Sequence, residues 1–253
     1  MNAQAAALAN KSRLAVILIL VLAASGCQPP AGPPQPTVWA VRVQYSAALV
    51  PVVKNLTACA EQQPGIGLIT HQLPASQLDP SKADLTVLLG SPAGYSGFSA
   101  QIGTDDLVVI VNPSNPAEVQ PKDIPGIFSG QIRSWDELSA RQAQGLATRQ
   151  PAPVHAWRYY AGEDIETALE RIFPAGEGFS DRLPQAPGPR EMVEAVASDP
   201  DAIGFIPRSF ATPEIRIVQI EDPGLQGVPQ LVLSPTEPRG PARKLVACLQ
   251  TRP

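Results

Sequence analysis

The chain has 253 residues, a hydrophobic content of 44% and a formal net charge of −4 at pH 7. This length permits one large domain or two small ones, and the apolar content is normal for a globular protein. An acidic chain argues against nucleic acid as a partner. A small anion stays possible, because its binding depends on the local field rather than on net charge.

The N-terminus has the features of a secretory leader. Lys11 and Arg13 precede the apolar run 14–24, and small residues then lead to Cys27. The run is shorter than the roughly 20 residues of a membrane span. We predict a signal peptide over residues 1–26, whose loss removes two cations and no acid and takes the net charge from −4 to −6.

The Gly-Cys at the end of this leader resembles the bacterial lipobox. It predicts a lipoprotein with Cys27 as the lipidated N-terminus, held outside the cytoplasmic membrane; the alternative is ordinary secretion with a free Cys27. Residues 28–36 contain five prolines. At ~3.1 Å per residue, an extended tether over residues 27–36 would span roughly 30 Å. We therefore expect a folded body on a stalk.

Strand and helix patterns alternate along the first half of the body. Period-two or continuous apolar runs predict strands at 38–43, 66–71, 83–91 and 106–113. Ser46 is suited to cap a helix that runs to about Gln62.

The second half continues this alternation. Two predicted helices begin at Pro121 and Asp136, and three more span 164–173, 189–199 and 241–250. The predicted strands span 154–159, 202–207, 215–220 and 229–234. Strands that alternate with helices imply an α/β protein with a mostly parallel sheet. The middle third is richer in Pro and Gly, which indicates a second lobe inserted between the two chain ends.

The sequence contains three cysteines and two histidines, which could form a disulfide or bind a metal. If Cys27 is acylated, Cys59 and Cys248 remain as a pair, and an oxidising compartment then favours a disulfide. The alternative is two buried free thiols. His71 and His155 are far apart and are expected within strands, so we predict no metal site and no cofactor.

One family resemblance covers most of the body, from about Val38 to the end. The matching marks, in order, are Asp105, Leu107–Val111, Asn112-Pro113, Asn115-Pro116, Ile127-Phe128-Ser129-Gly130, Trp135 and the segment Asp201–Phe210. In this order and spacing they resemble the phosphate-type substrate-binding proteins of ABC importers, which have the type 2 periplasmic binding protein fold.

The resemblance implies two α/β lobes joined by two crossing strands. Lobe one would be 37–111 plus 208–253 and lobe two 112–207, with crossings near Val111 and Pro207. A monomer of this kind closes about a hinge on a small anion and delivers it to a membrane permease.

The resemblance also implies the residues that would surround the anion. They are Ser46 and Ala47 at the first helix, Ser91 after the third strand, and Arg158, Ala161, Gly162 and Glu163 at a later helix start. Helix N-termini offer free N–H groups to anions, and the arginine fork suits an oxyanion. Several hydroxyl residues of the family pattern are absent here, since Ala47, Ala161 and Glu163 replace them.

Glu163 leaves three interpretations open. It can cap the helix, it can mark a changed ligand, or it can pair with Arg158 and close an empty cleft. A carboxylate about 4 Å from a bound anion would cost on the order of 4 kcal/mol at an effective dielectric constant of about 20. Farther along the same helix, Glu166 and Glu170 lie one turn apart and indicate a solvated face.

No enzyme signature is present, such as a Gly-x-Ser-x-Gly elbow, a Walker loop or HExxH. We expect a lipid-anchored solute-binding protein that captures phosphate or a similar oxyanion for an ABC importer. The alternative is a non-transporting sensor or surface interaction module that keeps the fold with a degenerate anion site.

Overall fold

The computed structural model describes residues 38–142, 152–220 and 222–251. From Val38 onward the chain forms one compact unit. The predicted signal peptide, the tether and Cys27 lie outside the described residues. Among the residues that are described, no helix combines the length and apolar character needed to cross a membrane.

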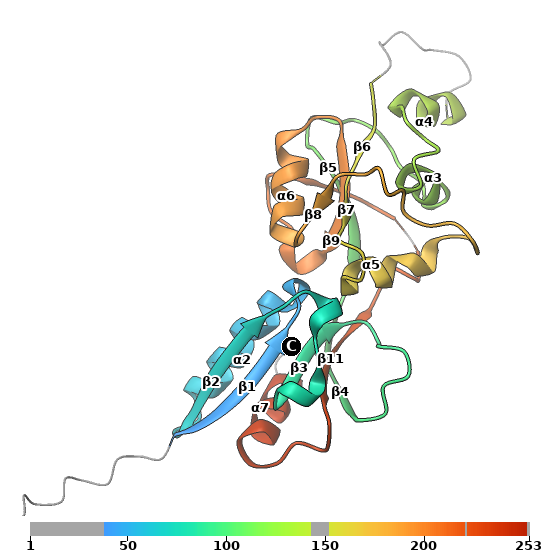
Figure 1. The fold of residues 1–253 in the computed structure, drawn as a ribbon. Helices are drawn as coiled ribbons and strands as arrows, with labels where there is room; N and C mark the ends of the chain where they lie inside the picture. Colours follow the sequence, from blue (N-terminus) through green and yellow to red (C-terminus); the bar gives the residue numbers. More distant parts are fainter. Residues whose placement is uncertain (1–37, 143–151, 221, 252–253) are drawn as a thin grey trace, which may run out of the picture. The chain divides into compact units, whose positions relative to one another are not determined.

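The first of two main sheets has five strands in the order β2-β1-β3-β11-β4 (Figure 1). The strands β1 (Trp39–Tyr45), β2 (Ile66–Gln72) and β3 (Leu85–Leu89) run parallel. The strand β11 (Val228–Ser234) lies antiparallel between β3 and β4 (Phe98–Asp105). A late segment of the chain therefore completes a sheet that the first segments begin.

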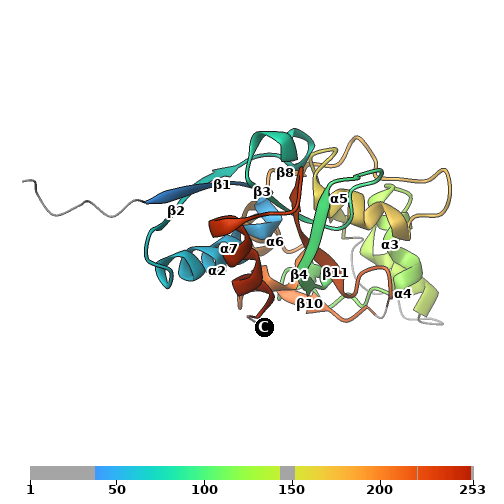
Figure 2. The same ribbon diagram turned by 90° about the horizontal axis from the view of Figure 1, so that it is seen from below.

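Two helices cover one face of this sheet. They are α2 (Val50–Glu61) and α7 (Gly240–Gln250), which lie side by side (Figure 2). Both have an apolar stripe that is buried, as expected of helices packed on a sheet. The other face is covered by residues 73–82, which contain only the short 3-10 turns η2 (Ala75–Gln77) and η3 (Pro80–Lys82).

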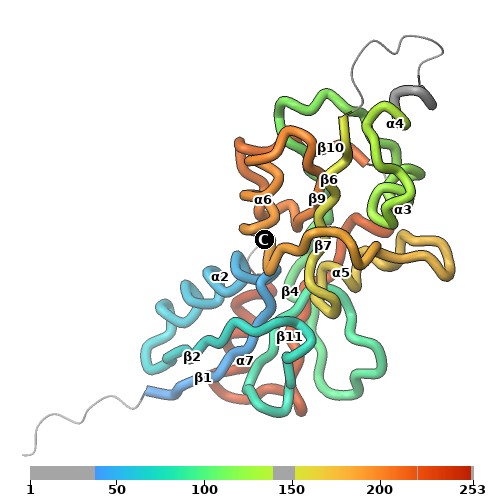
Figure 3. Tube along the Cα trace, turned by 45° about the horizontal axis from the view of Figure 1, so that its top comes forward, coloured from blue at the N-terminus to red at the C-terminus, as the bar shows by residue number. Residues whose placement is uncertain are grey.

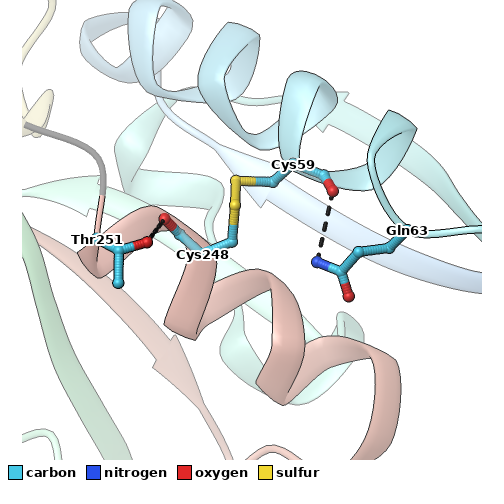
Figure 4. Close-up of a disulfide and its surroundings, with 4 residues drawn as sticks. All are labelled: Cys59, Gln63, Cys248 and Thr251. Carbon is cyan, nitrogen blue, oxygen red and sulfur yellow. Dashed lines mark hydrogen bonds between the residues drawn. A yellow bond between two sulfur atoms is a disulfide. The ribbon is translucent and has the colours of Figure 1, made fainter.

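A disulfide links the two helices through Cys59 of α2 and Cys248 of α7, whose Cα atoms are 6.1 Å apart (Figure 4). The Gln63 side-chain amide donates to the Cys59 carbonyl at 3.4 Å, and the Thr251 hydroxyl donates to the Cys248 carbonyl at 2.9 Å. The bridge thus ties a helix near the start of the body to the helix that closes it.

The second sheet has the order β10-β5-β9-β6. The strand β5 (Leu107–Val111) pairs antiparallel with both β10 (Arg216–Val218) and β9 (Ala202–Pro207). The short β6 (His155–Ala156) runs parallel to β9. A separate pair joins β7 (Arg158–Tyr159) to β8 (Gln185–Ala186).

Helices flank this second sheet. The helix α6 (Pro189–Ser198) packs on β9 and β5, and α3 (Ile124–Phe128) and α4 (Trp135–Gln142) lie on the opposite side (Figure 3). Phe128, Tyr159, Phe179 and Phe205 form edge and tilted ring contacts at centroid distances of 5.2–5.9 Å. These rings lie in the part of the hydrophobic core that adjoins the second sheet.

The structure corrects three sequence-based expectations. The sheets are mixed rather than mostly parallel, and β4 was not predicted. Sheet pairing places β5 and β10 in the second sheet, whereas the predicted boundaries put both in lobe one. The chain therefore passes between the sheets near Asp106 and again between β10 and β11. The reason is that β5, buried at all five positions, suits a central strand with neighbours on both sides.

Candidate functional site

The ends of β1 and β3 present two hydrogen-bond donors at one place. Ser46 follows β1 and is fully buried, and Leu89 is the last residue of β3. The Ser46 hydroxyl donates to Asp164 Oδ2 at 2.5 Å, and the Leu89 N–H donates to the same oxygen at 2.9 Å. We refer to Ser46 Oγ–H and Leu89 N–H as the donor pair. The group it binds is the chain's own carboxylate.

Asp164 is the first residue of α5 (Asp164–Leu169), which follows β7 in the chain. Its other oxygen, Oδ1, accepts the Ile165 N–H at 3.0 Å. Burial raises the pKa of Asp164 from 3.8 to about 6; hydrogen bonds from Ser46 and Leu89 oppose this rise, and nearby Glu163 adds to it. At neutral pH the donor pair therefore holds a mostly ionised, covalently tethered anion.

Glu163 reaches a different segment of the first sheet's connections. It occupies the N-cap position of α5, but its side chain makes no capping hydrogen bond. Instead its Oε2 accepts the Ala75 N–H at 3.2 Å. The capping interpretation of Glu163 is therefore wrong. Burial raises the pKa of Glu163, and the bond from Ala75 partly offsets this.

Gly162 allows the turn before α5 to pack closely against the 73–82 connection. Its φ of +84° is in the left-handed region, which glycine adopts without strain. A Cβ at this position would lie 3.2 Å from the Ser76 Cβ. The turn before α5 therefore lies against η2, and a larger residue would push the two segments apart.

Arg158 is buried and pairs with Glu166 rather than with Glu163. Its other terminal nitrogen lies 3.2 Å from Asp181 Oδ1, and its guanidinium stacks 5.3 Å from the Phe179 ring centroid. The expectation that Glu166 faces solvent is wrong, because β7 brings the Arg158 cation against the inner face of α5. Burial raises the pKa of Glu166, and its bond and charge contact with Arg158 oppose this. Glu170 is exposed as expected.

The remaining predicted site residues are distributed around this contact. Ala47 faces Gly188, where an added Cβ would lie 3.2 Å from the Ala47 Cβ. Ser91 and Ala161 are exposed. Of the predicted set, Ser46 contacts Asp164 at the end of β1, while Gly162 and Glu163 contact Ser76 and Ala75 of the 73–82 connection. Arg158 is instead engaged by Glu166 and Asp181.

Sequence reasoning missed the residue at the centre of this arrangement. The sequence predicts a helix from residue 164, and the acid at its start was the available signal for Asp164. A pocket of about 390 Å³ adjoins it, between α5, residues 90–95 and the sheet face that carries Thr86. In the described ranges no group of three or more His, Cys, Asp or Glu side chains could hold a metal ion.

Comparisons with solved structures identify the fold. A candidate phosphate ABC transporter substrate-binding protein from Clostridium perfringens, with bound phosphate, superposes with a TM-score of 0.71 at 17% identity, over 83% of this chain and 93% of that one. An ABC-type phosphate transport receptor from Vibrio cholerae gives 0.61 at 17% identity, over 83% and 94%. The CcmR regulatory domain from Synechocystis PCC6803, in complex with 2-PG, gives 0.60 at 13% identity, over 83% and 95%.

These likenesses show a common two-lobed α/β architecture for binding proteins and for a regulatory domain. No curated protein matches the chain in sequence. The family model described as "PBP superfamily domain" matches residues 90–232, which is more than half of the chain. The chain therefore belongs to the PBP superfamily domain family.

Proposed function

We propose that this protein is an extracytoplasmic, lipid-anchored binding module that senses or presents a solute at the cell surface without carrying free phosphate. The observation that carries the proposal is the position of Asp164. Its carboxylate takes both members of the donor pair, Ser46 Oγ–H and Leu89 N–H. Cys27 would provide the lipid anchor, and residues 28–36 would separate it from the body.

A free oxyanion competes poorly for the donor pair. Asp164 is tethered and buried, so its effective concentration at the pair is high and it cannot diffuse away. An oxyanion that bound beside it would meet a repulsion on the order of 4 kcal/mol at ~4 Å separation. That corresponds to a loss of affinity of roughly a thousandfold. Arg158 offers no compensation, because Glu166 and Asp181 already pair with it.

A second candidate is the capture of phosphate and its delivery to an ABC importer. It is favoured by the fold shared with the Clostridium perfringens protein, whose structure holds phosphate. In that case Asp164 must leave the donor pair when phosphate enters. The two candidate functions share their cellular location. They differ in whether the Asp164 carboxylate leaves the donor pair when phosphate is present.

Phosphate calorimetry on residues 38–253 separates the candidates. These residues contain the whole core cluster and the disulfide. We expect no phosphate binding by the unchanged protein at pH 7.5. Asp164→Ser should gain measurable phosphate affinity because it frees the donor pair, while Glu170→Gln, on the turn that follows α5, should stay inert. Micromolar phosphate binding by the unchanged protein would overturn the proposal in favour of transport.

A further inference from the structure

The pocket beside α5 has the size and lining of a site for a small organic molecule. Its volume of about 390 Å³ is within the range of roughly 300–1,000 Å³ that is typical of such sites. Its walls are mainly apolar and come from four segments of the chain. They include Leu78 and Pro80 from the 73–82 connection, Leu88 and Leu233 from the sheet, and Ala168 from α5.

A buried hydroxyl on the pocket wall has no partner. Thr86 is fully buried on β3, and its Oγ1 makes no hydrogen bond within the described residues. It lies on the sheet face that carries Gln44 and Leu233, its register partners on β1 and β11. Buried hydroxyls are nearly always hydrogen-bonded, so the unpaired Thr86 hydroxyl on the pocket wall is available to a polar group of a ligand.

Opposite charges lie at the two ends of the wall formed by α5 and the 3-10 turn that follows it, η5 (Glu170–Ile172). Asp164 lies at the buried end, and the single hydrogen bond to its Oδ1 leaves a lone pair for a further donor. Arg171 lies at the exposed rim and has no ion pair within the described part of the chain. Seven residues separate them, which is about 10 Å along a helix. Both residues line the pocket, so a solute that contacts both charged groups must be a molecule long enough to reach from one to the other rather than a small ion.

We infer that this pocket binds a zwitterionic solute of dipeptide size, with its ammonium at Asp164, its amide at Thr86 and its carboxylate at Arg171. Two extended residues span about 7 Å, which matches this spacing once the long Arg171 side chain leans inward. Apolar side chains of the solute would contact Leu78, Leu88 and Leu233. The inference rests on the proposed function, because it requires Asp164 to remain in place.

Inorganic phosphate does not fit the same pocket. It would meet apolar walls on several sides and the Asp164 carboxylate at the buried end. A solute with a single charge satisfies only one of the two ends. The donor pair can bind a free anion only if Asp164 leaves it. The pocket, in contrast, needs the Asp164 carboxylate in place to bind an ammonium group.

The test is calorimetry and thermal unfolding of residues 38–253 with L-alanyl-L-leucine. Its N-acetylated form, its C-terminal amide and free L-leucine serve as charge- and length-deleted probes. We expect the dipeptide to raise the unfolding temperature and to bind at least tenfold more tightly than each altered probe. Arg171→Gln should weaken the dipeptide at least tenfold but leave the affinity for the C-terminal amide unchanged. The exposed Arg190→Gln is the matched control.

Thr86 provides an independent check. Thr86→Val has the same shape and should lower dipeptide affinity severalfold, while Thr86→Ser, which restores the hydroxyl, should keep it. Absence of dipeptide binding, or equal binding of the capped probes, would overturn the inference. If the dipeptide fails and phosphate is also not bound, only this inference falls. If phosphate binds the unchanged protein, the proposed function falls with it.

Discussion

The stability of the protein should depend on pH through Asp164, and Asp164→Asn isolates this dependence. The pKa of the buried carboxyl is raised from 3.8 to about 6 in the folded state. Between these values the folded chain holds the Asp164 proton more tightly than the unfolded chain does. The contribution of this group to the unfolding free energy is therefore fully present below pH ~4, falls as pH rises through 6, and is constant above that.

The magnitude follows from the size of the shift. A change of about two pKa units at ~1.36 kcal/mol each gives roughly 3 kcal/mol between pH 4 and pH 7. Glu163 and Glu166 contribute slopes of the same sign, since burial raises the pKa of both. They remain in the variant, so the difference between the unchanged protein and Asp164→Asn reports Asp164.

Urea unfolding at half-unit pH steps from 4 to 7.5 measures this difference. We expect the free energy of the unchanged protein to fall relative to that of Asp164→Asn by about 3 kcal/mol over this range. Glu170→Gln, an exposed change on the neighbouring turn, should run parallel to the unchanged protein. If the unfolding free energy of Asp164→Asn has the same pH dependence as that of the unchanged protein, Asp164 is not the desolvated carboxylate that the structure describes. The conclusion that Asp164 occupies the donor pair would then be refuted.

Two further predictions concern the buried ion pair and the disulfide. Arg158→Met should cost about 3–5 kcal/mol in urea unfolding, because it leaves the Glu166 charge buried without its partner. Adding Glu166→Leu should recover most of that loss, and full additivity of the two changes would contradict the pairing. Replacing Cys59 and Cys248 together by Ala should lower stability by about 2–5 kcal/mol, since the bridge closes a separation of 189 residues. An unchanged unfolding midpoint would show that the bridge does not restrain the unfolded chain.

Local patterns account for much of the fold. The alternation in residues 38–43 and the apolar run at 106–113 correspond to β1 and β5, and the amphipathic spacing at 241–250 corresponds to α7. Such signals are local, because each needs only the period of its own element. The edge strand β4 was not predicted, although Phe98, Ala100 and Ile102 alternate with the exposed Ser99 and Gln101; the alternation covers only five residues, and none of the residues of β4 is fully buried.

Which side chains pair with one another in the site could not be predicted from such local patterns. Arg158 and Glu166 are eight residues apart, and the choice of Glu166 over Glu163 depends on the direction in which α5 turns after Gly162. The hydrogen bonds from Ser46 and Leu89 to Asp164 join residues 118 and 75 positions apart. No periodicity in the sequence carries that information.

The sequence by itself determined that acids stand at the start of α5, that Cys59 and Cys248 are available as a pair, and that strands alternate with helices. The tertiary structure decided that β5 and β10 join the second sheet and that Asp164 meets the donor pair of the first. The physical reason is that composition and period set which groups are present and which face is apolar. Whether an acid becomes a solvated charge, a cap or a buried surrogate for a ligand depends on desolvation and on donors brought by distant segments.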